Sequence, residues 1–296
     1  MSKQILLNAF DMNSVGHINH GLWTHPRDHS YRFDELSYWT DLAKTLEQGL
    51  FDGLFLADIT GVYDVYQGNL DLTLKESIQL PGHDPSTLVS AMAAVTQHLG
   101  FGVTVNLSYE PPYQFARRFA SLDHLTQGRI GWNIVTGYLD SAERLIGQKG
   151  LKDHDQRYAQ AEEFLELCYK FWEGSWQDDA VRKDKQRRIF TDPAKVHQIQ
   201  HAGKYYQSQG VFQVSPSVQR TPVLFQAGAS PRGLQFAARH AEAVFIGGDK
   251  PEKIKAQVDK IRSLAHEQGR EAVKIFLGIT AVTAETDALA QKKLAE

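Results

Sequence analysis

The chain of 296 residues carries 32 lysines and arginines against 35 aspartates and glutamates, so its formal charge of −3 gives no electrostatic reason to expect a nucleic-acid partner. Hydrophobic residues at 42% and charged residues at 23% exclude a disordered or fibrous protein, and the single cysteine, Cys168, excludes an internal disulfide. Apolar runs are strand-sized and no secretory leader opens the sequence. We therefore expect a soluble cytoplasmic protein without a membrane or nucleic-acid partner.

The predicted elements alternate between short apolar runs and helix-length amphipathic segments, which is typical of a parallel sheet built from βα units. In chain order, the predicted strands span residues 4–10, 52–57, 99–107, 129–135, 222–226, 243–246 and 274–282. The predicted helices span residues 33–48, 86–97, 112–125, 157–173, 231–241 and 251–268, and a further helical pattern covers 283–296. Cys168 falls on the apolar side of a predicted helix, so we interpret it as a core residue.

This order of elements predicts an α/β fold of the (β/α)8 TIM-barrel type, truncated before the eighth strand, as a single domain over residues 1–296. The alternative is a seven-stranded open, doubly wound sheet. The barrel is favoured because the first turn, FDMNSVGHINHG, lacks the glycine-rich loop that a dinucleotide-binding half places there.

Three connections are much longer than usual βα or αβ links, at residues 11–32, 58–85 and 174–221. The first two follow the carboxyl ends of strands, where barrel enzymes assemble their sites, and we expect them to act as lids. The third contains the basic run VRKDKQRR, which we interpret as a solvated loop rather than an anion site.

The segment VLFQAGASPRG joins a predicted strand to a predicted helix. Gly228 permits a tight turn, and Ser230 is the expected N-cap before Pro231 at the first helical position. Free backbone N–H groups and the positive end of the helix dipole suit a phosphate there. A plain strand–turn–helix with a serine cap is the equally good alternative.

Polar side chains also stand near the carboxyl ends of other predicted strands. Asp58 closes LFLAD and Asn133 lies within GWNIVTG, so both could hydrogen-bond a ligand, although Asp58 could instead cap its own loop. Thr104 and Thr136 offer hydroxyl groups on the same two neighbouring strands as weaker candidates.

Two further groups of residues are cationic or titratable. His154, Arg157 and Tyr158 lie around the start of the helix predicted at 157–173, and cations at a helix start favour an anionic ligand, with local packing as the alternative. The loop at 11–32 contains His17, His20, His25 and His29. Their spacing does not match a metal site, so we expect no metal and interpret them as residues lining a cleft or facing solvent.

Five segments in the order LFLAD, QLPGHDP, GWNIVTGYLDSAERLIG, HDQRY and VLFQAGASPRG resemble the bacterial luciferase-like flavin monooxygenases. The most similar branch contains nitrilotriacetate monooxygenase component A, long-chain alkane monooxygenase and dibenzothiophene sulfone monooxygenase. The resemblance covers essentially the whole chain. It implies an eight-stranded barrel, reduced FMN supplied by a separate NAD(P)H-dependent flavin reductase, O2 as co-substrate, and a homodimer or homotetramer.

Carried over residue by residue, the resemblance also implies a site. It places Asp58 and Thr104 at the isoalloxazine and ribityl region, with Asn133 and Thr136 on the next strand. The residues implied at the phosphate and its approach are His154, Tyr158, Gly228, Ala229 and Ser230. Tyr63 and Gln79 match substrate-side positions, and Tyr138 stands near the place where some relatives have a histidine, so proton handling is expected to differ.

The resemblance leaves alternatives open. A deazaflavin-dependent oxidoreductase on the same barrel transfers hydride without O2, and a flavin-binding protein without turnover is a third reading. The expected substrate is a small organic molecule, with sulfur-containing and carboxylated compounds as the first to test. The histidines of the loop at 11–32, together with Arg27, mildly favour a carboxylated one.

Overall fold

The computed structural model describes residues 5–228, 230–271 and 273–295. The chain divides into two compact units, Met1–Gln226 and Ala227–Glu296, which we call the first and the second unit and describe separately. That both belong to one domain remains a prediction. No helix in the described ranges is long and apolar enough to cross a membrane.

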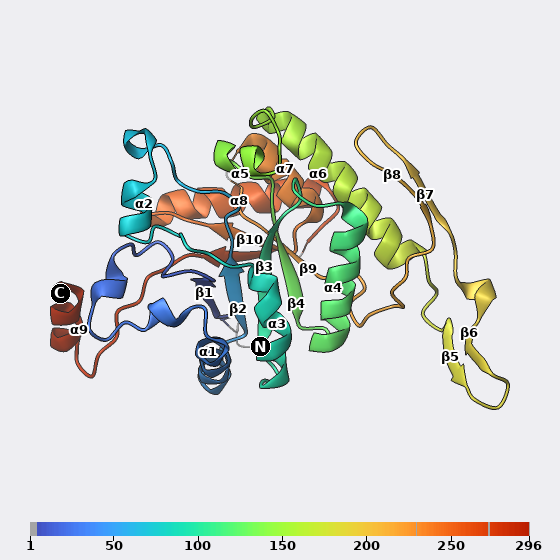
Figure 1. The fold of residues 1–296 in the computed structure, drawn as a ribbon, viewed down its shortest axis with the longest axis horizontal. Coiled ribbons are helices and arrows are strands. Elements are labelled where there is room, and N and C mark those ends of the chain that lie inside the picture. Colours follow the sequence, from blue (N-terminus) through green and yellow to red (C-terminus); the bar gives the residue numbers. More distant parts are fainter. Residues whose placement is uncertain (1–4, 229, 272, 296) are drawn as a thin grey trace. The chain divides into compact units, whose positions relative to one another are not determined.

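The first unit is built on a parallel sheet (Figure 1). Its strands pair in the order β1-β2-β3-β4-β9. Their bounds are β1 (Asn8–Met12), β2 (Gly53–Ala57), β3 (Gly100–Asn106), β4 (Ile130–Val135) and β9 (Val223–Gln226). Because parallel strands share one direction, all their carboxyl ends lie at the same edge of the sheet.

Helices cover one face of this sheet, and α3 and α4 lie side by side on it (Figure 1). The helices are α1 (Leu36–Gln48), α3 (Val89–Ala94), α4 (Pro112–Thr126) and α6 (His154–Tyr169). Phe115 of α4 packs against Trp132 of β4 with ring centroids 4.2 Å apart, and against Phe164 of α6 at 5.4 Å. Each buried aromatic side chain contributes about 1.5–3 kcal/mol of transfer free energy, so this cluster holds the layers together.

The opposite face of the sheet is also packed, which explains two glycines in the strands. A Cβ atom at Gly102 would lie 2.8 Å from the Phe55 ring, and one at Gly131 would lie 2.6 Å from the Phe225 ring. The strands are therefore apolar on both faces, as expected for a parallel sheet in an α/β protein.

Short elements that the sequence analysis did not predict surround the carboxyl edge. They are the helices α2 (Asp71–Lys75) and α5 (Asp140–Leu145) and the 3-10 turns at Leu22–Thr24, Ser30–Arg32 and Tyr66–Gly68. The helix predicted at 86–97 is a 3-10 turn at Pro85–Leu88 that continues into α3. Helices of five or six residues carry too little periodicity to be read from sequence, because they cover less than two helical turns.

The insertion at 174–221 forms two antiparallel hairpins rather than an irregular loop. A π-helical turn at Lys170–Gly174 ends α6, and β5 (Val181–Asp184) then pairs with β6 (Ile189–Thr191). The run VRKDKQRR is therefore a strand and its turn, which corrects the predicted loop, although it is largely solvent-exposed as expected. A 3-10 turn at Pro193–Lys195 precedes the second hairpin, β7 (Ile199–Ala202) with β8 (Gln207–Gly210).

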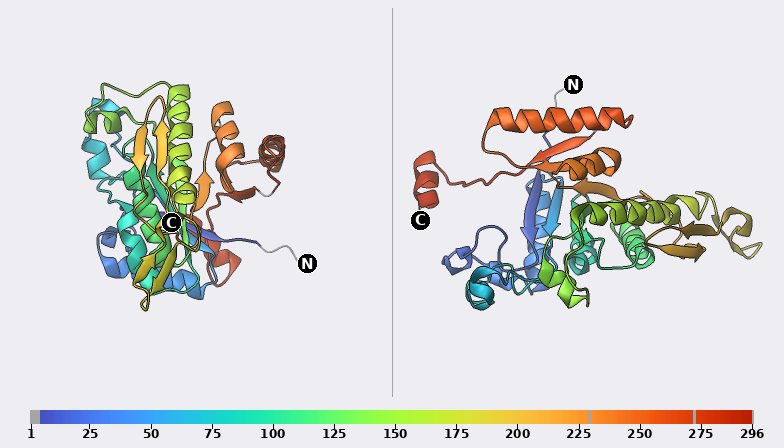
Figure 2. Two further views of the ribbon diagram at one scale, coloured as in Figure 1. Left: turned by 90° about the vertical axis from the view of Figure 1, so that its right-hand side faces the viewer. Right: turned by 90° about the horizontal axis from the view of Figure 1, so that it is seen from above.

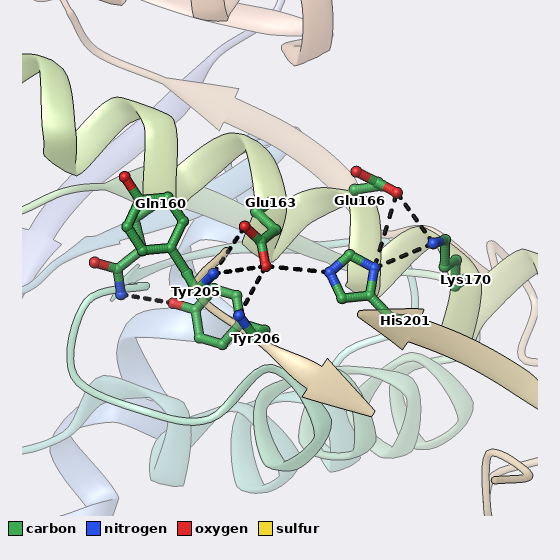
Figure 3. A network of polar contacts seen from close by, with 7 residues as sticks. All are labelled: Gln160, Glu163, Glu166, Lys170, His201, Tyr205 and Tyr206. Carbon is green, nitrogen blue, oxygen red and sulfur yellow. Dashed lines mark hydrogen bonds and ion pairs between the residues drawn. The ribbon is translucent and has the colours of Figure 1, made fainter. Parts of the chain in front are cut away.

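The β7–β8 hairpin lies beside α6 (Figure 2) and is fixed by a polar network (Figure 3). Buried His201 has Nε2 3.2 Å from Glu163 Oε1 and Nδ1 3.1 Å from Lys170 Nζ. Glu163 also accepts the backbone N–H groups of Tyr205 and Tyr206. Burial raises the pKa of Glu163, but these hydrogen bonds outweigh it and hold that pKa below its usual value.

The second unit holds a pair of parallel strands, β10 (Ala243–Ile246) and β11 (Lys274–Leu277). Its helices are α7 (Pro231–His240), α8 (Pro251–Glu267) and α9 (Asp287–Ala295). Ala237, Val244, Ile261 and Ala265 form its small core.

Two predicted strands are shorter than expected, for a common reason. The strand predicted at 4–10 begins only at Asn8, opposite Gly53, where its neighbour β2 starts. The strand predicted at 274–282 ends at Leu277, opposite Ile246, where β10 stops. A strand lasts only as long as its partner, and the partner's length is not visible in the strand's own sequence.

Candidate functional site

The structure brings Thr104 and Asn133 together near the carboxyl edge of the first unit. They are register partners on β3 and β4, both are buried, and the Asn133 amide nitrogen donates to the Thr104 hydroxyl at 2.9 Å. The Asn133 Oδ1 atom is buried and has no hydrogen-bond partner in the described part of the chain. A buried amide oxygen without a donor is costly, so this pair fits a ligand that supplies an N–H or O–H group.

Asp58 follows β2 at the same edge and is half-buried. Burial, with a smaller contribution from the nearby charge of Asp84, raises its pKa to about 7, although a hydrogen bond from Ile59 N–H opposes the shift. Asp58 is therefore an acid that exchanges a proton near neutral pH.

Asp11, at the end of β1, was not among the predicted residues. Burial raises its pKa to about 6, with Asp28 adding to the shift and a hydrogen bond from Met12 N–H opposing it. A carboxylate near the end of an apolar strand was the available signal, the same one that identified Asp58.

Tyr63, predicted on the substrate side, and Tyr138, predicted in connection with proton handling, meet through their hydroxyl groups at an oxygen–oxygen distance of 2.7 Å. Burial, followed by the hydrogen bond with Tyr63, raises the pKa of Tyr138, so the Tyr138 hydroxyl keeps its proton at physiological pH. Gln79 is half-buried in the same segment with a backbone φ of 54°. Within the described chain, no hydrogen bond joins Gln79 to either tyrosine.

The segment 58–85 is held on two sides. Val62 exchanges two hydrogen bonds with the Ser141 hydroxyl, at 2.9 and 2.7 Å, and Asp64 forms an ion pair with Arg144. On its other side, His83 N–H donates to the Asn13 carbonyl at 2.8 Å. These contacts hold the segment against α5 and Asn13 in this structure, and its action as a lid stays a prediction.

The amino end of α6 begins at His154, three residues before the start expected from sequence. The Asp153 side chain accepts a hydrogen bond from the Asp155 N–H and caps the helix. One of the free N–H groups of the first turn is therefore already paired within the protein. His154 Nδ1 lies 2.9 Å from Asp155 Oδ1, and its ring stacks near Tyr158 with centroids 5.0 Å apart. The two aspartates weaken the expectation of a purely cationic helix start.

In the second unit, Ser230 is the N-cap of α7, as predicted, and its hydroxyl accepts the Gly233 N–H at 3.0 Å. Gly228 precedes it outside any regular element, and Ala229 lies outside the described residues. Since these residues and His154 belong to different units, a joint phosphate site stays a prediction.

Thr136 is half-buried after β4, and its carbonyl accepts the Ser108 hydroxyl.

The histidine-rich segment 11–32 is less cationic than the sequence suggested. Burial, and secondarily the charge of His20, lowers the pKa of His17 to about 4. His17 also packs edge-on against Phe10, with centroids 4.7 Å apart, and is neutral at physiological pH. His17 therefore adds no positive charge, while the expectation of a carboxylated substrate, which also rested on His20, His25, Arg27 and His29, stays a prediction.

Comparison with known proteins shows the family to which this chain belongs. Residues 17–296 match the model of the luciferase-like monooxygenase family, so the chain belongs to that family. It is 52% identical over 296 residues to the long-chain alkane monooxygenase of Geobacillus thermodenitrificans, covering 99% of this chain and 67% of that protein. It is 49% identical to the dimethyl-sulfide monooxygenase of Hyphomicrobium sulfonivorans, covering 100% of this chain and 62% of that protein.

Solved structures agree with this assignment. The crystal structure of long-chain alkane monooxygenase superposes with a TM-score of 0.98, over 100% of this chain and 68% of that one. DmoA from Hyphomicrobium sulfonivorans superposes with a TM-score of 0.96, over 99% and 63%. These similarities confirm the predicted luciferase-like α/β fold, and the chain spans about two thirds of the length of these relatives.

Proposed function

We propose that this protein is an FMNH2- and O2-dependent monooxygenase that receives reduced flavin from a separate NAD(P)H-dependent reductase and oxygenates a small organic substrate. The observation that carries the proposal is the unpartnered Asn133 amide oxygen beside Thr104 near the carboxyl edge. Support comes from an FMNH(2)-dependent dimethylsulfone monooxygenase of Pseudomonas putida, 30% identical over 214 residues, and from nitrilotriacetate monooxygenase component A of Aminobacter aminovorans, 34% identical.

The residues present fit a flavin mononucleotide. Asn133 and Thr104 offer a buried acceptor and hydroxyl for the ring and ribityl chain, together with Asp58 and Thr136. The phosphate would be held by His154, Tyr158, Gly228, Ala229 and Ser230. Bound reduced FMN supplies the electrons that activate O2 for transfer of one oxygen atom to the substrate.

The chain's own residues position reactants and manage protons. Asp58 can hold or release a proton near pH 7, because its pKa is raised to about 7. The hydrogen bonds between Val62 and Ser141 hold segment 58–85 against α5, beside the Tyr63–Tyr138 pair. Neutral His17 adds no positive charge to this side of the site. Sulfur-containing and carboxylated compounds are the first substrates to test.

The test is oxygen uptake by the full-length protein with a flavin reductase, NADH and catalytic FMN. We expect substrate-dependent product that carries one atom of label from 18O2. Peroxide release without product indicates a flavin-binding protein without turnover. Anaerobic reduction of a deazaflavin would favour the hydride-transferring alternative. Sedimentation of the same sample tests the proposed homodimer or homotetramer.

A further inference from the structure

Thr73 is a buried residue of the short helix α2, outside the residues discussed so far. It is only 4% exposed, and its Oγ1 atom donates a hydrogen bond to the backbone carbonyl of Tyr63 at 2.6 Å. A helical threonine normally bonds back to a carbonyl of the preceding helical turn. Here the hydroxyl instead reaches a residue ten positions earlier, so the bond closes a loop and fixes the backbone at Tyr63.

The backbone beside Tyr63 is also held by α5. The hydroxyl of buried Ser141 accepts the Val62 N–H at 2.9 Å and donates to the Val62 carbonyl at 2.7 Å. Asp64 forms an ion pair with Arg144, but the Arg144 side chain is 52% exposed, so this pair contributes less than the buried hydrogen bonds. Tyr63 is thus held by hydroxyl groups from two different helices.

The partner of Tyr63 is attached to the same framework, because Tyr138 lies two residues before α5 begins. The two phenol oxygens are 2.7 Å apart. Hydrogen bonds between hydroxyl groups are best near about 2.7–2.8 Å and need good alignment, so the contact depends on both backbones being fixed. Only one hydroxyl of the pair can donate to the other, which leaves one hydroxyl hydrogen for an acceptor atom of a ligand.

We propose that Thr73 is a positioning residue: its hydroxyl, together with that of Ser141, holds Tyr63 so that the Tyr63–Tyr138 pair presents one hydroxyl hydrogen to the substrate. The proposal rests on the proposed function, which puts this pair beside the substrate. In this arrangement Thr73 does not touch the substrate and acts through Tyr63. The substrate class that fits carries a hydrogen-bond acceptor, such as a carboxylate or a thioether sulfur.

A double-mutant cycle in the full-length protein tests the positioning without flavin or substrate. Tyr138→Phe removes the contact between the hydroxyl groups, and the stability that it costs is measured by urea unfolding. This cost should fall to less than about half when Thr73→Val is already present, because the pair is then no longer aligned. Thr73→Ser keeps the hydroxyl and should restore the full cost of Tyr138→Phe. Full additivity of Thr73→Val and Tyr138→Phe overturns the proposal.

Thr45→Val is the matched control for the cycle. The Thr45 hydroxyl also donates to a backbone carbonyl, that of Asp41 at 2.8 Å, but within α1. Its effect on stability and that of Tyr138→Phe should therefore add.

Steady-state oxygen uptake with the reductase present tests the link to the substrate. The probe is (methylthio)acetate, a small molecule with both a thioether and a carboxylate. We expect Thr73→Val to lower kcat/KM about three- to tenfold through KM, with kcat changed by less than about twofold, because the pair binds the substrate. Adding Tyr138→Phe should cause little further loss, and Thr73→Ser should recover most of it. A fall in kcat alone, or a loss that Thr73→Ser does not recover, overturns the proposal.

The two measurements separate this proposal from the proposed function. Protein that shows coupling in the cycle but does not turn over the probe supports the positioning role of Thr73 and counts against the proposed function. Active protein whose cycle is additive removes the positioning role and leaves the function intact. If Thr73→Val does not fold, Thr73→Ala replaces it, since alanine removes the hydroxyl without placing a methyl group against the Tyr63 carbonyl.

Discussion

The hydroxyl groups of Tyr63 and Tyr138 lie 2.7 Å apart, although 75 residues separate them in the sequence. Their contact depends on α5, since Ser141 binds the backbone of Val62, one residue before Tyr63. The side of the carboxyl edge predicted to face the substrate is thus assembled from two connections that follow different strands.

The tyrosine pair should contribute to substrate recognition. Tyr138→Phe removes one hydroxyl from a pair held at 2.7 Å, so we expect kcat/KM to fall about three- to tenfold, the equivalent of one hydrogen bond. Steady-state oxygen uptake with the reductase present measures this. Tyr66→Phe, an exposed tyrosine of the same segment, is the control and should retain full kcat/KM. Equal kinetics for Tyr138→Phe and wild type would remove the pair from the site.

The fit between Gly61 and α5 should matter for stability. An alanine Cβ at Gly61 would lie 2.8 Å from both the Ala142 N and the Ser141 Oγ atoms, at a φ of +106°. We expect Gly61→Ala to lower the free energy of unfolding by about 2–4 kcal/mol, from strain and from the displaced contact.

Gly147→Ala is the matched control for this variant, because its φ is +79° but nothing lies within 4 Å of the added atom. Gly147→Ala should lower the free energy of unfolding by only about 1 kcal/mol, from backbone strain alone. Urea unfolding of both variants measures the difference. Similar losses in the two proteins would show that the segment 58–85 is not tightly seated on α5.

Asp58 should make stability depend on pH. Its pKa rises from 3.8 in the unfolded chain to about 7 in the folded one, so between these values the folded state binds more protons. Asp58 therefore favours the folded state most below about pH 4, where it is protonated in both states, and this contribution to the free energy of unfolding is lost as the pH rises to about 7. Asp58→Asn removes this loss and should be more stable than the wild type at pH 8, on the order of 1–3 kcal/mol.

Urea unfolding at several pH values between 5 and 8 tests the Asp58 prediction. The difference between variant and wild type isolates Asp58, because Asp11, whose pKa is raised to about 6, titrates in both proteins. Asp71→Asn, at an exposed position of α2, controls for the loss of a surface charge. Parallel stability curves for Asp58→Asn and wild type would contradict the prediction.

Ser230→Asp should separate the capping role of this residue from phosphate binding. Aspartate is as good an N-cap as serine, so the stability of α7 should change by less than about 1 kcal/mol. The added negative charge should nevertheless abolish FMN binding, while riboflavin binding persists. Thermal melting and flavin fluorescence measure the two effects. Unchanged FMN binding would remove Ser230 from the phosphate site.

The sequence by itself determined the order of the parallel strands and of the longer helices, the fold class and the family, because local hydrophobic periodicity and short motifs carry that information. It also predicted the Ser230 cap correctly, and the position of Asp58 directly after a strand, since strand ends and helix starts are local features. Its errors concern partners: two strands were predicted too long, and the basic run of the insertion was predicted as a loop.

Only the tertiary structure decided the contacts between connections. The Tyr63–Tyr138 pair and the hydrogen bonds between Val62 and Ser141 join residues that lie far apart along the chain. No periodicity marks such contacts, because they depend on which loops meet at the carboxyl edge after the sheet has formed. The pKa values of Asp58 and His17 also arise in this way, since burial depends on neighbours that the local sequence does not name.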